Sequence, residues 1–260
     1  MTTDALFRRL GPDTFAPTPH AGGAWADGEC HFSAAAGLLV HAVEQFRARN
    51  GNPELQLARV SFDILGALPL AEIDVHVEML RPGRTIELVQ ATASIAGRSV
   101  ITARAWSLVA SDTADAAALE HAPLPPPEEC PPSGLGADWP GGFITQLEAR
   151  HAAETRPGRG AVWLRSSVPL IEGEGAGEVA EHFSRIDIAN GVAPRQEPGQ
   201  WAYPNVDMTV HLFRRPAGEW TGLDTTVEWG PTGVGVTSSV LHDATGPVGR
   251  VEQCLTLRRR

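Results

Sequence analysis

A chain of 260 residues, 42% of them apolar, can bury a substantial core, which excludes a disordered or fibrous protein. Its formal net charge is −10 and its longest basic run is Arg258–Arg260, so nucleic acid is excluded as a partner. Three scattered cysteines, no signal-peptide pattern and no apolar run of about 20 residues predict a cytoplasmic protein that does not enter membranes.

A helix is predicted first, over Phe32–Arg49, because apolar side chains recur on one broad face of it. Ser33 is the expected N-cap, and Asn50-Gly51 is the expected stop. Turn residues then separate four strand-like runs. These runs are Gln56–Ala67, Ala71–Leu80, Thr85–Ile95 and Ser99–Val109.

A proline-rich segment follows at residues 122–140. Proline at this density forbids helix and central strand and favours a stiff, extended linker. The segment therefore predicts a boundary between an N-terminal unit, residues 1–121, and a C-terminal unit, residues 141–260.

The second half repeats the order of a helix followed by four strands. Two strand-like runs come first, and a helix is then predicted over Gly177–Ala189 and closed by Asn190-Gly191. The predicted strands of this half are Phe143–His151, Gly160–Val168, Ala202–Phe213, Glu219–Trp229, Gly235–His242 and Gly249–Leu257.

Matching turns support an internal duplication. Val77-Glu78 followed by Gly83 reappears as Val227-Glu228 followed by Gly233. The alternative is that any two meanders share turn glycines and prolines, but the order, the spacing and the preceding helix favour a duplication. The predicted fold class is therefore α+β, with two fused units of one helix on an antiparallel sheet.

Three segments resemble a known family: Glu78–Thr85, Asn205–Pro216 and Gly246–Arg258. In this order they resemble double hot-dog proteins of the acyl-CoA thioesterase II type, in the thioesterase-like superfamily. The resemblance implies a double hot-dog fold and hydrolysis of acyl-CoA or a related acyl thioester, without metal or cofactor. It also implies a role in fatty acid metabolism and a possible homodimer or homotetramer.

The resemblance also implies an aspartate, a glutamine and a threonine that orient the attacking water. Carried onto this sequence, the aspartate falls on Asp207 and the glutamine on Gln253. The threonine has no clean counterpart: an ungapped count from Trp220 reaches Glu228, which is assigned to substrate binding, and nearby Thr232 is assigned to catalysis.

The residues themselves can support that chemistry. A carboxylate accepts a proton from water, and an amide fixes the same water. Strand alternation places Asp207 on the face opposite Met208, and it places Gln253 on the apolar face of the last strand, between Val251 and Leu255. In the competing interpretation for Asp207, its side chain faces solvent from the edge or end of a strand. In that for Gln253, its side chain only forms a structural bridge to a loop.

Oxyanion donors are expected from backbone amides at the start of the first helix, near His31, Phe32 and Ser33. Within the duplication, Asp207 corresponds to Ser61 and Gln253 to Arg104, so one polar site per chain is expected, in the second unit. The His31 side chain itself is interpreted as a capping or surface histidine and not as a catalytic one.

Two other functions remain open at this level. One is a non-catalytic acyl-CoA or lipid-binding protein, since the family's threonine and paired glycines are missing. The other is a hot-dog hydratase or dehydratase, which needs an Asp/His pair near a helix start. Asp187 and Asn190 lie late in the second helix and have no suitably spaced histidine, so this alternative is disfavoured.

Overall fold

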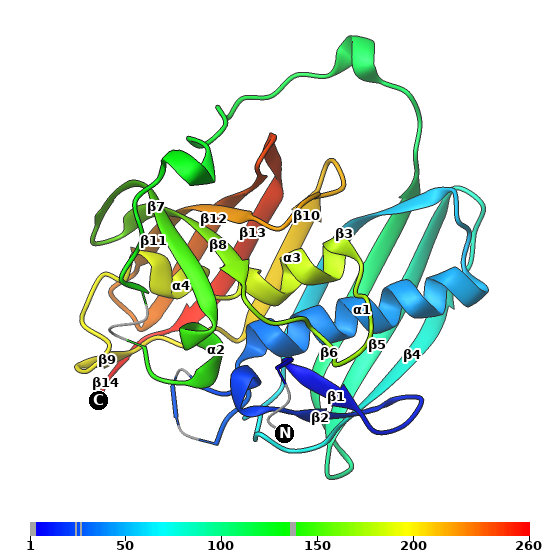
Figure 1. Cartoon of the computed structure of the whole chain (residues 1–260), viewed down its shortest axis with the longest axis horizontal. Helices are drawn as coiled ribbons and strands as arrows, with labels where there is room; N and C mark the ends of the chain where they lie inside the picture. Colours follow the sequence, from blue (N-terminus) through cyan, green and yellow to red (C-terminus); the bar gives the residue numbers. More distant parts are fainter. Residues whose placement is uncertain (1–3, 24, 27, 136–138) are drawn as a thin grey trace.

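The structure is a computed structural model that describes residues 4–23, 25–26, 28–135 and 139–260. Twelve strands form one antiparallel sheet, and helices lie across one face of it (Figure 1). In spatial order the strands are β1 (Phe7–Arg9), β2 (Thr14–Pro17), β4 (Ile73–Arg81), β5 (Ile86–Ile95), β6 (Arg98–Val109), β3 (Leu55–Ile64), β10 (Asp207–Leu212), β13 (Gly246–Thr256), β12 (Val234–Asp243), β11 (Thr221–Trp229), β8 (Arg159–Ser166) and β7 (Leu147–Arg156).

The two halves join through β3 and β10 in the middle of this sheet. These strands pair antiparallel, with Val210 opposite Val60 and Met208 opposite Phe62. A continuous hydrophobic core crosses the junction, where the ring of Phe62 lies 6.1 Å from that of Phe183. The α+β double hot-dog prediction is confirmed, because each half contributes a helix and an antiparallel meander to one shared sheet.

The first helix, α1 (Phe32–Asn50), has nearly the predicted bounds. Its N-cap is His31 and not Ser33, because the His31 Nδ1 atom accepts a hydrogen bond from the Ser33 amide at 3.1 Å. The predicted stop is confirmed: Gly51 is the C-cap and donates its N–H to the Arg47 carbonyl.

The second helix is split into α3 (Glu178–Ile186) and the short α4 (Ala189–Val192). Helix α3 runs antiparallel to α1, since Ser33 contacts Asp187 at one end and Glu44 lies against Gly177 at the other. The helices touch closely at Gly37, where an added Cβ atom would lie 2.5 Å from the Cβ atom of Ser184. This close approach fixes the position of the chain that follows α3.

Local differences from the predicted strands have simple causes. The run predicted at Phe143–His151 begins as a helical turn, α2 (Gly142–Thr145), before β7. The run predicted at Ala202–Phe213 is interrupted by Pro204, which separates β9 (Trp201–Ala202) from β10. Strands β1 and β2 are too short for their alternation to be noticed, and β9 pairs with β14 (Arg258–Arg259) in a separate ribbon.

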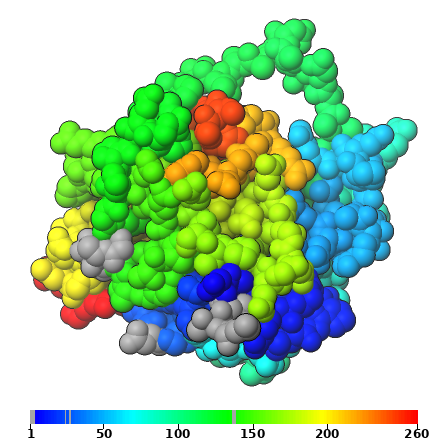
Figure 2. Space-filling view, in the orientation of Figure 1, coloured from blue at the N-terminus to red at the C-terminus, as the bar shows by residue number. Residues whose placement is uncertain are grey.

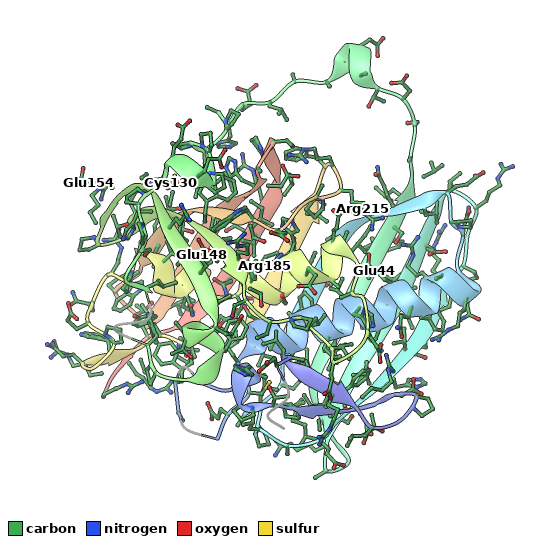
Figure 3. All side chains as sticks on the ribbon, viewed as in Figure 1. Glu44, Cys130, Glu148, Glu154, Arg185 and Arg215 are labelled. Atoms are coloured by element: carbon green, nitrogen blue, oxygen red, sulfur yellow. The ribbon has the colours of Figure 1, made fainter. Side chains whose placement is uncertain are left out.

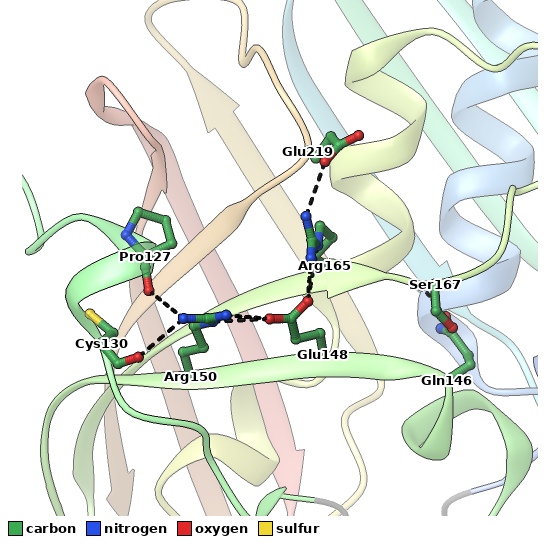
Figure 4. A network of polar contacts seen from close by, with 8 residues as sticks. All are labelled: Pro127, Cys130, Gln146, Glu148, Arg150, Arg165, Ser167 and Glu219. Atoms are coloured by element: carbon green, nitrogen blue, oxygen red, sulfur yellow. Dashed lines mark hydrogen bonds and ion pairs between the residues drawn. The ribbon is translucent and has the colours of Figure 1, made fainter.

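The proline-rich connection has two parts. Residues 111–120 are exposed and belong to an arch that stands away from the body of the protein (Figures 1 and 2). The chain then returns to β7, where the Arg150 guanidinium donates to the carbonyls of Pro127 and Cys130 (Figure 4). Residues 136–138 of the predicted linker lie outside the described residues.

Among the residues that the structure describes, no helix is both long and apolar enough to cross a membrane. The same residues include no group of three or more histidine, cysteine, aspartate or glutamate side chains arranged to hold a metal ion.

Candidate active site

A buried carboxyl group lies where the end of α3 meets the start of α1. Asp187 is the C-cap of α3, between Ile186 and Ile188, and it is only 5% exposed. Its backbone N–H donates to the Ser33 hydroxyl at 2.9 Å, which ties it to the first turn of α1. The contact between the two helices therefore fixes the position of this carboxyl group.

Two neutral amides hold one oxygen of this carboxyl group. Asn205 donates to Asp187 Oδ1 at 2.7 Å, and Gln253 donates to the same oxygen at 2.7 Å. Asn205 also donates to the Asp207 carbonyl, which fixes its side chain at the start of β10. Within the described part of the chain, Asp187 Oδ2 and Gln253 Oε1 have no hydrogen-bond partner.

This environment changes the acidity of Asp187. Burial raises its pKa from the ordinary value of 3.8 to about 7, and the hydrogen bonds from Asn205 and Gln253 oppose that rise. No cation is among the causes. A carboxyl group with a pKa near neutrality can both take up and release a proton, as a general base must.

Asp187 faces a cavity of about 580 Å³. The polar residues of its lining include Asp187, Asn190, Asn205 and His31. The first unit supplies apolar wall residues such as Phe32, Ile64 and Leu68. Other apolar wall residues are Leu135, Trp139, Ile144, Ile188 and Val206. A largely apolar cavity with a few convergent polar groups suits a small organic substrate.

The start of α1 lies at this cavity, since His31 and Phe32 both line it. The N–H of His31 donates to the Ala21 carbonyl, and that of Ser33 donates to the His31 ring. The N–H of Phe32, between them, has no acceptor among the described residues. Burial lowers the pKa of His31 to about 3, so the ring is neutral and serves as the cap while it stacks on Phe143.

Asp207 and Gln253 lie on opposite faces of the sheet, which corrects the expected pairing. In the β10–β13 register, Val210 lies opposite Val251, so Met208 lies opposite Gln253 and shares its buried face. Asp207 points the other way, and its Oδ1 atom accepts a hydrogen bond from the Cys254 amide at 2.7 Å. The glutamine therefore contacts Asp187, and Asp207 acts as a link between strands.

The remaining expected residues are only partly brought together. His31 and Phe32 line the cavity and Ser33 holds Asp187, but Thr232 and Glu228 do not line it. Thr232 lies in the turn between β11 and β12, and both side chains are exposed.

The sequence pointed to Asp187 only for the disfavoured hydratase, and it did not point to Asn205. One signal was present: Asp187 is an acidic residue in an apolar run, Ile186-Asp187-Ile188-Ala189, where burial disfavours a charged side chain. Asn205 carried no such signal, because its contact with Asp187 exists only after the fold brings β10 beneath α3.

A separate polar network lies on the other side of α3. Glu148 bonds Arg150 and Arg165, and Gln146 bonds Ser167 (Figure 4). Arg185, labelled in Figure 3, is buried and donates to the Thr221 hydroxyl at 3.1 Å. A second cavity of about 560 Å³ lies here, and its lining contains more carboxylates than arginines, so it is a poor site for an anion.

Comparisons with solved structures agree with the fold. A candidate thioesterase from Novosphingobium aromaticivorans shares 21% identity, with a TM-score of 0.73, over 97% of this chain and 98% of its own. An acyl-CoA thioesterase II from Mycobacterium marinum shares 16% identity, with a TM-score of 0.67, over 98% of this chain and 96% of its own. A hot-dog protein of unknown function from Alicyclobacillus acidocaldarius shares 13%, with a TM-score of 0.74, over 98% and 97%. No curated protein sequence matches.

Family models match both halves. The model of the acyl-CoA thioesterase C-terminal domain matches residues 127–257, and that of the N-terminal domain matches residues 21–108. The chain therefore belongs to the acyl-CoA thioesterase family and is a thioester hydrolase.

Proposed function

We propose that this protein hydrolyses acyl-CoA with Asp187 as general base and with Asn205 and Gln253 as the residues that position it. The observation that carries the proposal is the Asp187 carboxyl group itself: buried, held by two amides at 2.7 Å, and facing a 580 Å³ cavity. Its pKa near 7 suits proton transfer at neutral pH. This assignment replaces Asp207, whose carboxylate binds a backbone amide.

In the proposed reaction, a water donates one hydrogen bond to Asp187 Oδ2 and the other to Gln253 Oε1. Both oxygens are acceptors without a partner among the described residues. As the water oxygen attacks the thioester carbonyl carbon, Asp187 takes its proton. When the carbon–sulfur bond breaks, the proton passes from Asp187 to the departing thiolate, which leaves the free acid and the thiol and restores the carboxylate.

The carbonyl oxygen becomes negative during the attack. The free N–H of Phe32 lies in the first turn of α1, where backbone donors have no helical acceptor and the helix dipole favours negative charge. We assign this amide to the oxyanion, in keeping with its place in the cavity wall. The thioester is already activated, so the mechanism uses no covalent intermediate.

Two matched substitutions test the proposal. In Asp187→Asn the base is lost, so the release of free thiol from acyl-CoA should fall about 1,000-fold in kcat, within the usual range for a general base. Asp207→Asn keeps an oxygen that can accept from the Cys254 amide, so its kcat should stay within about threefold of the wild-type value. Circular dichroism of both variants shows that each is folded.

The opposite result would be decisive. If Asp207→Asn abolished turnover while Asp187→Asn retained it, the general base would be Asp207 and the assignment to Asp187 would fail.

A further inference from the structure

Three consecutive arginines line the opening of the cavity. Arg258, Arg259 and Arg260 are all exposed and all belong to its lining. Their backbone is held in place: β14 pairs with β9, with Arg258 opposite Ala202, and the N–H of Arg260 donates to the Gln200 carbonyl at 3.0 Å. The arginines therefore have a fixed position at the edge of the site.

Aromatic rings support two of these side chains. The Arg259 guanidinium lies 5.1 Å from the centre of the Trp201 ring, and that of Arg260 lies 5.6 Å from the centre of the Trp25 ring. Stacking on a ring holds a guanidinium while leaving its N–H groups free to bind.

The charge of this cluster is uncompensated. No carboxylate in the described part of the chain forms an ion pair with Arg258, Arg259 or Arg260. By contrast, Arg47 pairs with Glu87 and Arg214 pairs with Asp243. A chain with a net charge of −10 thus keeps its longest basic run free at the opening of its substrate cavity.

We propose that Arg258–Arg260 bind the phosphate groups of the CoA carrier and so make the enzyme selective for CoA thioesters. The inference rests on the proposed function, since it places the thioester at Asp187 and the far end of the carrier at the cavity opening. Arginine binds phosphate through paired, charge-assisted hydrogen bonds, and three adjacent guanidinium groups suit a carrier with a pyrophosphate and a further phosphate. A carrier-protein thioester presents a single phosphodiester and would use the cluster poorly.

The test compares substrates that differ only in their phosphates. Wild type and the triple variant Arg258→Ala/Arg259→Ala/Arg260→Ala are assayed with an acyl-CoA, the same acyl-dephospho-CoA and the same acyl-pantetheine. The control is Arg49→Ala/Arg84→Ala/Arg98→Ala, which removes the same charge from exposed arginines that do not line the cavity. The binding of free CoA and of pantetheine is measured by calorimetry in parallel.

For acyl-CoA, the triple variant should show a KM raised about 100-fold and a kcat that is nearly unchanged. The rise in KM should be smaller for acyl-dephospho-CoA and absent for acyl-pantetheine. Added salt should raise the wild-type KM for acyl-CoA and leave that of the triple variant unchanged. The control variant should behave as wild type.

Equal losses on all three substrates, or no loss on any, would overturn the proposal. So would a triple variant that loses activity on an acyl carrier protein but not on acyl-CoA. If wild type turned over no substrate, the proposed catalytic function would fail, while weaker binding of free CoA by the triple variant alone would still establish the phosphate site.

Discussion

The antiparallel contact between α1 and α3 has an acidic group at each of its ends, and the two ends treat their acids differently. At the end that faces the cavity, Asp187 meets only the neutral amides of Asn205 and Gln253, and burial raises its pKa to about 7. A carboxyl group in that setting exchanges its proton near neutral pH.

At the other end, the acids meet cations. Glu44, labelled on α1 in Figure 3, lies 4.0 Å from Arg215, whose charge opposes the rise in pKa that burial causes. Glu174 is held by Arg9 at 2.9 Å and lies 3.6 Å from His41, and the Arg9 hydrogen bonds lower its pKa. The Glu174 carboxylate stays charged, and its pairing with Arg9 holds β1 and the loop before α3 together. The partner of the carboxyl group, amide or guanidinium, thus separates the end that we propose as catalytic from the structural end.

The largest expected effect is a gain in the free energy of unfolding when Asp187, at the end of the helix contact that faces the cavity, is replaced. The folded pKa of Asp187 lies above its ordinary value, so the unfolding free energy should fall as pH rises from about 4 to about 7. Asp187→Asn removes this penalty. Its unfolding free energy should exceed that of wild type by up to about 4 kcal/mol at pH 8 and by less than about 1 kcal/mol at pH 4. Denaturant unfolding at a series of pH values measures this difference in unfolding free energy. If the two proteins showed the same dependence of unfolding free energy on pH, the raised pKa of Asp187 would be contradicted.

A second, smaller effect concerns the amides. Gln253→Leu removes a donor that favours the ionised carboxyl group, so the pKa of Asp187 should rise further and the acidic limb of the kcat/KM profile should move to higher pH. Turnover at pH 7 should fall about 30-fold to 100-fold. The matched control is Gln146→Leu, a buried glutamine that bonds Ser166 away from the cavity. An acidic limb that did not move in Gln253→Leu would show that the amide does not act on Asp187.

The smallest effect belongs to the structural end. Arg9→Leu should lower the unfolding free energy by about 1 kcal/mol at pH 7, since the Arg9–Glu174 pair is partly exposed. The pKa of Glu174 is lowered in the folded state, so this loss should disappear as pH falls through the range in which that carboxylate is protonated. The pH profile of turnover should not change. A shifted profile would mean that the two ends are coupled through α1.

The sequence supports the fold further than it supports the site. Helix α1 was predicted nearly to its ends because its apolar face is continuous, and the strands were predicted because alternation and turn residues are local signals. The site depends on contacts between distant residues, such as Asp187 with Gln253, 66 positions apart in the chain.

Alternation alone placed Asp207 opposite to the buried face of its strand, and Gln253 on the buried face of another strand. Only the register between β10 and β13 shows that these two faces are the two sides of one sheet. The expected meeting of Asp207 and Gln253 was therefore wrong, because pairing between strands, and not the pattern within a strand, decides which side chains meet.

The pairing of β3 with β10 has a consequence for how the chain could be divided. A cut in the exposed arch, residues 111–120, would leave two fragments, each with a helix and each with one newly exposed edge strand, β3 or β10. The cavity takes wall residues from both fragments, and its carboxyl group, Asp187, comes from the second. We therefore expect hydrolysis only when the two fragments reassociate through β3 and β10, a behaviour that would suit a reporter of proximity between two proteins fused to the halves.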